Sequence, residues 1–248
     1  GLPVALPPTE IETDYTAHQI FDFRKKYLPT RAVAYHCPPR FDTATIEKIQ
    51  TQAEQLFALF GMHDFGRFDG WVLSDGRIWF SDFNPISGME QNSFLFQQAS
   101  RIGMTHSDAL RHVVESACRR QGVRFPKIVE QKSAPRKKVN IIMGGDNSER
   151  QVSLMSGTNV WLKLRHSKEY EPHPYLLDAK GALWRLPYHL CLNHTVEEIA
   201  ENCEKYQNAK EKLSEFEERA RLRLGLLEKK NMEEFFEPRK LTMKEFIK

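Results

Sequence analysis

The 248-residue sequence has few cysteines, no long apolar run and almost no excess of charge of either sign. Its four cysteines form no CxxC pair and match no zinc-binding spacing, which favours reduced, partly buried thiols. No apolar run approaches the roughly 18 residues that a membrane-spanning helix needs. The 36 basic and 33 acidic residues leave a formal net charge of +3, too even for a nucleic-acid or membrane-surface footprint. We therefore expect neither nucleic acid nor a membrane as a partner.

Composition and length together indicate a folded protein of one or two domains. Hydrophobic residues make up 40% of the chain and charged residues 28%, which excludes a wholly disordered and a collagen-like chain. A length of 248 residues fits two ordinary domains or one large one. The chain opens Gly1-Leu2-Pro3, with neither Met nor the apolar core of a signal peptide, so we expect a piece cut from a longer polypeptide.

The spacing of apolar residues predicts three helices. Residues 43–60 and 107–120 carry apolar side chains three and four positions apart, and Gly61 is the expected stop of the first helix. From residue 195 to about 230, the same spacing predicts a long charged helix or a helical hairpin. We expect this segment to pack as a surface helix rather than to form an oligomerising coiled coil.

Two segments are predicted to be mainly irregular or connecting chain. Residues 1–41 are interrupted by six prolines, which predicts loops and short extended pieces. Residues 132–138 are polar and basic and contain Pro135, which predicts a linker. A basic run of this length is typical of a solvated connector and not of a nucleic-acid patch.

A short buried strand is predicted at Val139–Met143, running into Gly144-Gly145. The next helix is expected to have Ser148 as its N-cap, with Gln151 completing a capping box. A strand, two glycines and a helix N-terminus form a turn that favours anions in general, and this one lacks the GxGxxG spacing of a dinucleotide site. By itself the loop is therefore interpreted as structural.

The pattern of residues 66–84 predicts a β-hairpin, and this hairpin contains the main candidate functional residues. Asp75-Gly76 between apolar runs predicts a two-residue type I′ turn. With those two residues as the loop, the expected opposed pairs are Leu73 with Ile78, Trp71 with Phe80, Asp69 with Asp82, and Arg67 with Asn84. Alternation along the strands then places Arg67, Asp69, Asp82 and Asn84 on one face.

Two directly opposed carboxylates beside Asn84 predict a bound cation, because like charges at that spacing repel. The ligand set of Asp69, Asp82 and Asn84 is all oxygen, which suits Mg²⁺ or Mn²⁺ and not zinc. Arg67 on the same face would bind an anion beside the metal. The alternative is an exposed polar hairpin end with unrelated charges, and the choice depends on the strand register.

Gly88 follows the hairpin in a polar turn. A glycine permits close approach to its backbone, so the Gly88 N–H could serve an oxyanion. A plain turn is the alternative explanation of this residue.

These segments resemble the D-alanine–D-alanine ligase family of the ATP-grasp superfamily. The matching residues in the first half, in order and spacing, are Lys26-Tyr27-Leu28, Cys37-Pro38, Gly66-Arg67-Phe68-Asp69, Asp82-Phe83-Asn84, Gly88-Met89 and Ser93. Residues 144–154 with Ser156-Gly157 resemble the N-terminal signature of the same family. The resemblance implies an α/β fold with the C-terminal lobe of an ATP-grasp domain at residues 1–131 and a linker at 132–138. Residues 139–248 would form an incomplete, Rossmann-like preATP-grasp domain with a long helical insertion.

The resemblance also implies roles for particular residues. Asp69, Asp82 and Asn84 would hold Mg²⁺ ions that bridge the phosphates of ATP. Lys26 would touch the transferred phosphate, and Tyr27 would belong to a loop that closes over the site. Arg67 and the Gly88 N–H would stabilise a tetrahedral intermediate. Ser93, with the Phe94 backbone, would hold the carboxylate of the second D-alanine, and Glu149 would pair with the amino group of the first.

The order of the two matching segments is inverted relative to the family, which predicts a tandem protein with two ligase copies. This chain would be the end of copy one, a linker and the start of copy two. Circular permutation is the less favoured account. The expected partners are D-alanine, ATP and the second ligase copy in the same parent chain, with a second subunit of a homodimer as a further candidate. Such tandem ligases resemble those of plants and algae, which implies the chloroplast stroma; otherwise the cytoplasm is expected.

Two departures from the family pattern bear on activity. Asp82 stands where the family usually has Glu, and Pro85-Ile86-Ser87 replaces its usual Thr and Pro. The half of an ATP-grasp domain that binds adenine is not among the matched residues, so we expect that this chain alone does not turn over. Two other functions stay open: a catalytically dead nucleotide-binding or assembly module, and another ATP-grasp ligase that joins a carboxylate to an amine.

Overall fold

A computed structural model describes residues 2–13, 33–86, 88–126, 135–226, 232–235 and 237–247, without the side chains of 207–216 and 232–233. Two compact units divide the chain. The first consists of Gly1–Pro126 with Glu211–Glu228, and the second of Lys127–Lys210 with Lys229–Lys248. Both contain helices and strands, so the predicted α/β class is confirmed at the level of a mixed α/β protein.

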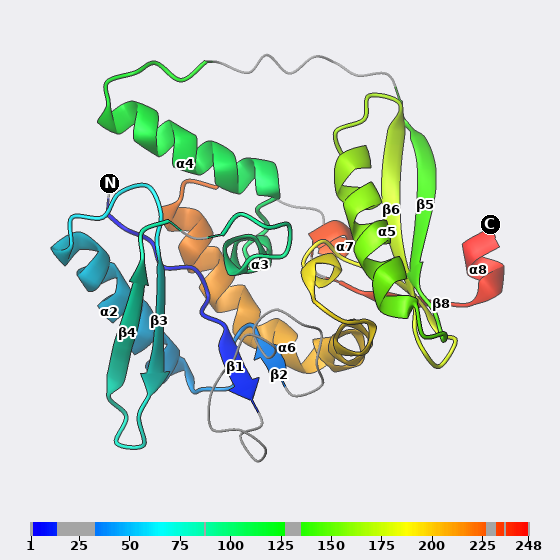
Figure 1. Ribbon diagram of the computed structural model, residues 1–248, viewed down its shortest axis with the longest axis horizontal. Coiled ribbons are helices and arrows are strands. Elements are labelled where there is room, and N and C mark those ends of the chain that lie inside the picture. The colour runs from blue at the N-terminus through cyan, green and yellow to red at the C-terminus, as the bar shows by residue number, and fades with distance from the viewer. Residues whose placement is uncertain are drawn as a thin grey trace. The chain divides into compact units, whose positions relative to one another are not determined.

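The first unit contains two small antiparallel sheets and several helices (Figure 1). Its elements are β1 (Glu10–Thr13), β2 (Val33–His36), α2 (Thr43–Leu59), β3 (Arg67–Val72), β4 (Ile78–Asn84), α3 (Phe94–Arg101) and α4 (His106–Arg120). Strand β1 pairs with β2, and β3 pairs with β4. The extended pieces expected before residue 41 are therefore present as β1 and β2.

Helices α2 and α4 confirm two of the predicted helices. Helix α2 begins after Asp42, whose side chain accepts a hydrogen bond from the Thr45 N–H at 2.7 Å. It stops before Gly61, which has a φ of +59°, a conformation that glycine adopts without strain. Helix α4 begins one residue earlier than predicted, because Thr105 and Asp108 form a capping box.

The tip of the β3–β4 hairpin differs from the prediction. Val72 pairs with Ile78 and Trp71 with Trp79, so the predicted pairs Leu73–Ile78 and Trp71–Phe80 are wrong. The Leu73 N–H donates to the Arg77 carbonyl at 2.8 Å, which leaves three residues, 74–76, in the loop. Gly76 has a φ of +77°, as expected for a three-residue loop closed by a left-handed residue.

A β-bulge beside Gly70 restores the register further along the hairpin. The register shifts between Asp69 and Gly70, where Asp69 pairs with Asp82 but Gly70 pairs with Phe80, so Ser81 is an extra residue on β4. A Cβ on Gly70 would lie 2.3 Å from the Trp79 carbonyl oxygen, so only glycine allows the strands to approach here. The three-residue loop and the bulge shift the register in opposite directions, and the predicted pair of Asp69 with Asp82 is confirmed.

The bulge also sorts the side chains between the two faces of the hairpin. Phe80 and Phe83 are three residues apart, yet both rings contact Phe68, with centroids 6.0 and 5.2 Å away. Phe83 further packs against Phe60, just after α2, at 4.9 Å. The aromatic face of the hairpin thus lies toward α2 (Figure 1), and the face with the two aspartates is left open.

The second unit is built on a four-stranded sheet with strand order β5-β6-β7-β8. Its elements are β5 (Lys137–Gly144), α5 (Arg150–Leu164), β6 (Tyr170–Leu177), β7 (Leu183–Arg185), a 3₁₀ turn (Leu190–Leu192), the start of α6 (Val196–Arg223), α7 (Met232–Phe235), β8 (Arg239–Leu241) and α8 (Met243–Ile247). Strands β5 and β6 are parallel and joined through α5, whereas β7 and β8 add antiparallel pairs. Strand β5 starts two residues before the predicted strand.

Helix α5 covers one face of β5 and β6 and buries the main apolar core of this unit (Figure 1). A Cβ on Gly157 would lie 2.7 Å from the Met143 Cβ, which shows how closely helix and strand approach. The fully buried side chains of the unit include Trp161, Tyr188, Met143, Leu176, Leu190, Leu192, Ile199 and Val196. Helix α6 is one continuous helix of 28 residues, which confirms the predicted long helix and excludes the helical hairpin over that span.

Strand β6 carries Pro172 and Pro174, which cannot donate backbone hydrogen bonds. The carbonyls of Glu169 and Leu177 accept from the β5 side, from Lys137 and Gly145, whereas the Pro174 carbonyl accepts from Leu186 on the other side. In β6, the backbone nitrogen and carbonyl groups of the even-numbered residues therefore point away from β5. Strand β7 pairs only with residues 175–177, so the two prolines stand where no N–H is required.

No helix in the described part of the chain combines the length and the apolar character needed to cross a membrane.

We predict that Gly70→Ala destabilises the first unit, because the added Cβ would force the two strands apart. The expected loss of unfolding free energy is about 1–3 kcal/mol, as for other overpacked sites, measured by urea denaturation. Ser81→Ala is the matched control, because the exposed Ser81 hydroxyl makes only a long bond of 3.3 Å to the Asp69 carbonyl. An equal loss in both variants would contradict the proposed role of Gly70.

Candidate functional site

The open face of the β3–β4 hairpin brings together four of the predicted site residues. Asp69 lies directly opposite Asp82, and Arg67 lies opposite Asn84. Strand alternation places all four on one face, away from the aromatic side chains that pack on α2. The predicted register and the shared face are therefore confirmed for Arg67, Asp69, Asp82 and Asn84, whereas their roles stay predictions.

Each aspartate has a hydrogen-bond donor on its own strand. Arg67 donates from Nε and Nη2 to the two carboxylate oxygens of Asp69, each at 2.9 Å. Asn84 donates from Nδ2 to an Asp82 oxygen at 3.1 Å. The Asp69 side chain is 45% exposed, so its oxygens keep lone pairs accessible from solvent. The guanidinium of Arg67 thus pairs with Asp69, and the amide of Asn84 pairs with Asp82.

The donor set of this face fits a divalent cation. Two carboxylates and one guanidinium leave a net charge of −1, and the carboxylates repel each other across the strands. A cation bound between them would relieve that repulsion, and oxygen ligands favour Mg²⁺ or Mn²⁺. The hairpin face has only two carboxylates. Within the described residues, no group of three or more His, Cys, Asp or Glu side chains is placed to hold a metal ion.

Ser93 and Phe94 lie at the start of helix α3. Ser93 is the N-cap residue, but its side chain makes no capping hydrogen bond. The Ser93 hydroxyl oxygen is buried and has no hydrogen-bond partner among the described residues. A buried hydroxyl without a partner is costly, so this group is available to a ligand. The hydroxyl oxygen is covered in this structure, so a ligand could reach it only after a local rearrangement.

Gly88 lies in that turn and is exposed. A Cβ on Gly88 would collide with the carboxylate of Glu90, so glycine permits this close approach. An acidic side chain here opposes an oxyanion at the Gly88 N–H unless Glu90 moves away. Lys26 and Tyr27, predicted to contact ATP, lie outside the described residues.

Glu149 lies in the second unit, at the N-terminus of helix α5. It is the N-cap residue, its side chain is exposed, and its N–H donates to Asn147 Oδ1 at 3.0 Å. The predicted cap at Ser148 with a capping box from Gln151 is therefore wrong. Asn147 provides the acceptors at this helix start instead: its side chain accepts from the Glu149 N–H, and its carbonyl accepts from the Arg150 N–H at 3.4 Å.

Gln151 and its neighbour Arg150 instead hold the start of helix α6. Arg150 donates from Nε to Glu197 Oε1 at 2.7 Å, and Gln151 donates from Nε2 to Glu197 Oε2 at 2.6 Å. Gln151 Oε1 also accepts from the Val196 N–H at 3.0 Å. Burial alone would raise the pKa of Glu197, but the hydrogen bonds from Arg150 and Gln151 outweigh it and lower that pKa. The sequence pattern did not identify Glu197, because its partners are 46 and 47 residues away.

Comparison with known proteins identifies both halves of the chain. Residues 3–115 match a family model described as D-ala D-ala ligase C-terminus, and residues 138–243 match one described as D-ala D-ala ligase N-terminus. The chain belongs to the D-alanine–D-alanine ligase family. The segment that matches the C-terminal model precedes the one that matches the N-terminal model, as the sequence motifs indicated.

Curated relatives are D-alanine–D-alanine ligases of bacteria. The Fervidobacterium nodosum ligase is 27% identical over 120 residues, which is 48% of this chain and 36% of that protein. The ligase of Alkalilimnicola ehrlichii is 28% identical over 120 residues, covering 48% of this chain and 37% of its own length. The Laribacter hongkongensis ligase is 31% identical over 113 residues, 46% of this chain and 35% of that protein. The chain thus spans about a third of the length of the curated relatives it matches.

We predict that Glu197→Gln lowers the stability of the second unit at neutral pH by about 1 kcal/mol, the usual contribution of a partly exposed charged hydrogen bond. The lowered pKa of Glu197 means that this stabilisation is present above the unfolded-state pKa, about 4.3. It is lost as the pH falls through the lower folded-state pKa. Thermal unfolding of both proteins between pH 3 and 8 should show the difference disappearing at the acid end.

Glu201→Gln is the matched control, because Glu201 lies one turn further along α6 and pairs only with the exposed Lys205. This change should cost less than about 0.5 kcal/mol. A Glu197→Gln deficit that is the same at pH 3 and pH 8 would show that the charged contacts are not its cause.

Proposed function

We propose that the parent protein is an ATP- and Mg²⁺-dependent ligase that joins two D-alanines. Family membership supports this, and so does the arrangement of the hairpin face. The observation that carries the proposal is the opposition of Asp69 and Asp82 on an exposed face that also holds Arg67 and Asn84. A purely structural hairpin has no need of two acidic residues in directly opposed positions.

Asp69, Asp82 and Asn84 would hold Mg²⁺, or Mn²⁺, through oxygen atoms alone. When bound, the cation supplies neutralisation of the negative charge on the ATP phosphates. Arg67, which Asp69 holds through two N–H groups, would bind an anionic oxygen beside the carboxylates.

The reaction proposed by analogy with the family has two steps. One D-alanine carboxylate attacks the terminal phosphorus of ATP, which yields an acyl phosphate and ADP. The amine of the second D-alanine then attacks the acyl carbon, and phosphate leaves as the peptide bond forms. Such a reaction needs neutralised charge and correct positioning more than an acid–base group.

The remaining site residues would position the substrates. Ser93 and the Phe94 N–H lie at the N-terminus of α3, where a carboxylate is favoured by the helix dipole. Glu149, exposed at the start of α5, would pair with the ammonium group of a D-alanine. The Gly88 N–H would serve the developing oxyanion, Lys26 the transferred phosphate and Tyr27 the closing loop.

The order of the two family segments supports a tandem arrangement. We propose that residues 1–131 form an ATP-grasp C-terminal lobe and residues 139–248 the beginning of a second copy with a Rossmann-like preATP-grasp fold. The linker expected at 132–138 overlaps strand β5, because Lys137 and Lys138 pair with Tyr170 and Glu171, so its last two residues belong to the second copy. The parallel β5-α5-β6 unit supports the last assignment. Glu149 would then serve the second copy and Asp69 the first. A tandem ligase of this kind is expected in a chloroplast, as the sequence resemblance implied.

One observation favours a second candidate, a nucleotide-binding module without catalysis. Asp82 is one methylene shorter than the Glu usual in the family, and its carboxylate already accepts a hydrogen bond from Asn84. Both oxygens of Asp69 are likewise engaged by Arg67. If these contacts persist with nucleotide bound, the face could hold a cation without supporting phosphoryl transfer.

We expect Asp69→Ala and Glu149→Ala, made separately in the intact parent protein, each to remove the D-alanine-stimulated ADP formation of its own copy, and the double variant to lose at least tenfold of the total rate. The reasons are the loss of a cation ligand and the loss of an ammonium partner. Asp75→Ala is the matched control, because Asp75 lies at the tip of the same hairpin and pairs only with Arg77. If D-alanine stimulates ATP use and neither variant changes the rate, the residue assignments are wrong. If no amino acid stimulates ATP use, the nucleotide-binding module is the better conclusion.

Ser93→Ala should raise the KM for D-alanine about tenfold, because one hydrogen bond to a carboxylate contributes on the order of 1–2 kcal/mol. The melting temperature should stay unchanged, since the Ser93 hydroxyl makes no capping bond in the folded protein. Steady-state kinetics and a thermal melt of the same preparation test both statements. A lower melting temperature with an unchanged KM would assign Ser93 a structural role instead.

A further inference from the structure

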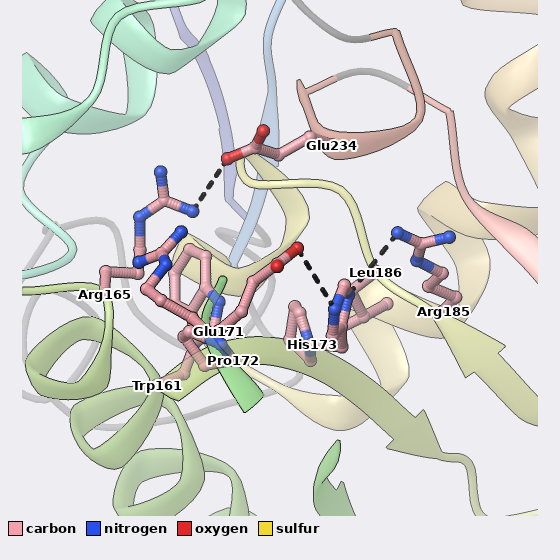
Figure 2. A pocket seen from close by; sticks show the side chains of 10 residues that line it. Trp161, Arg165, Glu171, Pro172, His173, Arg185, Leu186 and Glu234 are labelled. Atoms are coloured by element: carbon pink, nitrogen blue, oxygen red, sulfur yellow. Dashed lines mark hydrogen bonds and ion pairs between the residues drawn. The ribbon is translucent and has the colours of Figure 1, made fainter. Parts of the chain in front are cut away.

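The second unit contains a polar cavity of about 130 Å³ that none of the proposed ligase residues line. It is bounded by the first residues of β6, the end of β7, the end of α5 and the short helix α7 (Figure 2). Strand β6 runs from this cavity to Leu177, which pairs with Gly144 at the C-terminal end of the strand. The cavity is therefore at the other end of β6 from the loop that carries Glu149.

Three arginines line the cavity: Arg136, Arg165 and Arg185. Arg165 donates to Glu234 at 2.9 Å, and its guanidinium lies 4.7 Å from the centre of the Tyr188 ring. Arg136, just before β5, makes no hydrogen bond or ion pair with any described residue. Two carboxylates, Glu171 and Glu234, also line the cavity.

His173 adds a further donor to the lining. Its Nδ1 lies 3.5 Å from Nη2 of Arg185, and arginine has only donors, so Nδ1 is the acceptor and Nε2 carries the proton. Burial, and then the charge of Arg185, lower the pKa of His173, which keeps the ring neutral. Nε2 is buried without a hydrogen bond; Glu171 Oε1 is 3.4 Å away, and Figure 2 shows that carboxylate facing the ring.

Trp161 adds a second unsatisfied donor. Its side chain is 1% exposed, and the indole Nε1 is buried with no hydrogen-bond partner among the described residues. Buried N–H groups are nearly always paired with an acceptor, and leaving one unpaired is costly. Two buried N–H groups without a hydrogen bond line the same cavity as the Arg136 guanidinium, which indicates that the cavity lacks an acceptor.

We propose that this cavity binds a small oxyanion of the phosphate or carboxylate type. An anionic oxygen would be held by the guanidinium of Arg136, which has no partner among the described residues. Charge-assisted hydrogen bonds from arginine to such oxygens are stronger than those between neutral groups. To reach His173 Nε2, the anion must displace the Glu171 carboxylate, which is 41% exposed and can swing into solvent.

Calorimetric titration of the full chain with inorganic phosphate, and separately with acetate, at constant ionic strength tests the proposal. We expect saturable binding of at least one of the two, and the tighter one identifies which oxyanion the cavity takes. Arg136→Ala should weaken that binding at least tenfold. Arg136→Lys should lose less, because it keeps the charge but not the planar fork.

Lys180→Ala is the matched control, because it removes the same charge from the same unit in the turn between β6 and β7, away from the cavity. The affinity of the Lys180→Ala variant for the anion should equal that of the unchanged chain. Binding that is insensitive to Arg136→Ala would place the anion elsewhere on the chain, and equal weakening in both variants would show a general charge effect. Either result, or the absence of saturable binding of both anions, overturns the proposal.

Discussion

The close approach of strands β3 and β4 at Gly70 is the constraint on which the hairpin site depends. The three-residue tip alone would place Asp69 opposite Ser81 and turn the Asp82 carboxylate toward the aromatic face against α2. The extra residue at the bulge, made possible because Gly70 has no Cβ, moves Asp82 by one position. The paired carboxylates and the phenylalanine cluster therefore have the same origin, since one shift of register sends each set to its own face.

In both family segments, some residues fix the backbone and their neighbours remain exposed. In the hairpin, Gly70 sets the register and Asp82 is left accessible. In the second unit, Arg150 and Gln151 anchor the first turn of α5 to Glu197, and Glu149 beside them is exposed. A sequence signature of this kind therefore contains a structural part and a part that contacts ligands. Neighbouring positions within it need not serve the same purpose.

The sequence predicted the regular helices well, because their signals are local. Thr43–Leu59 and His106–Arg120 combine apolar periodicity with a cap at one end, and both are present. The hairpin face was predicted correctly although its turn was not. The predicted two-residue turn was wrong by one residue, and the bulge corrected the pairing at Asp69. The local pattern of residues 66–84 does not distinguish a hairpin with a three-residue loop and a bulge from a regular hairpin with a two-residue loop.

Features that depend on distant residues were not predictable from local patterns. Glu197 forms its contacts only when α6 lies beside α5. Ser148 does not cap α5 because the neighbouring Asn147 accepts from the N–H groups of Glu149 and Arg150. Strand β6 was missed because Pro172 and Pro174 argue against a strand. The absence of a β7 partner at those positions, which makes the prolines tolerable, is a tertiary property. The unpaired donors of Trp161 and His173 are likewise visible only in three dimensions.

Pro172 and Pro174 have a consequence beyond the folding of their own strand. Both prolines are buried and line the polar cavity, and the Pro174 carbonyl accepts from the Leu186 N–H, so this side of β6 is covered and not open to solvent. Neither ring nitrogen carries a hydrogen. The strand therefore brings no unpaired backbone N–H into the cavity at these two positions.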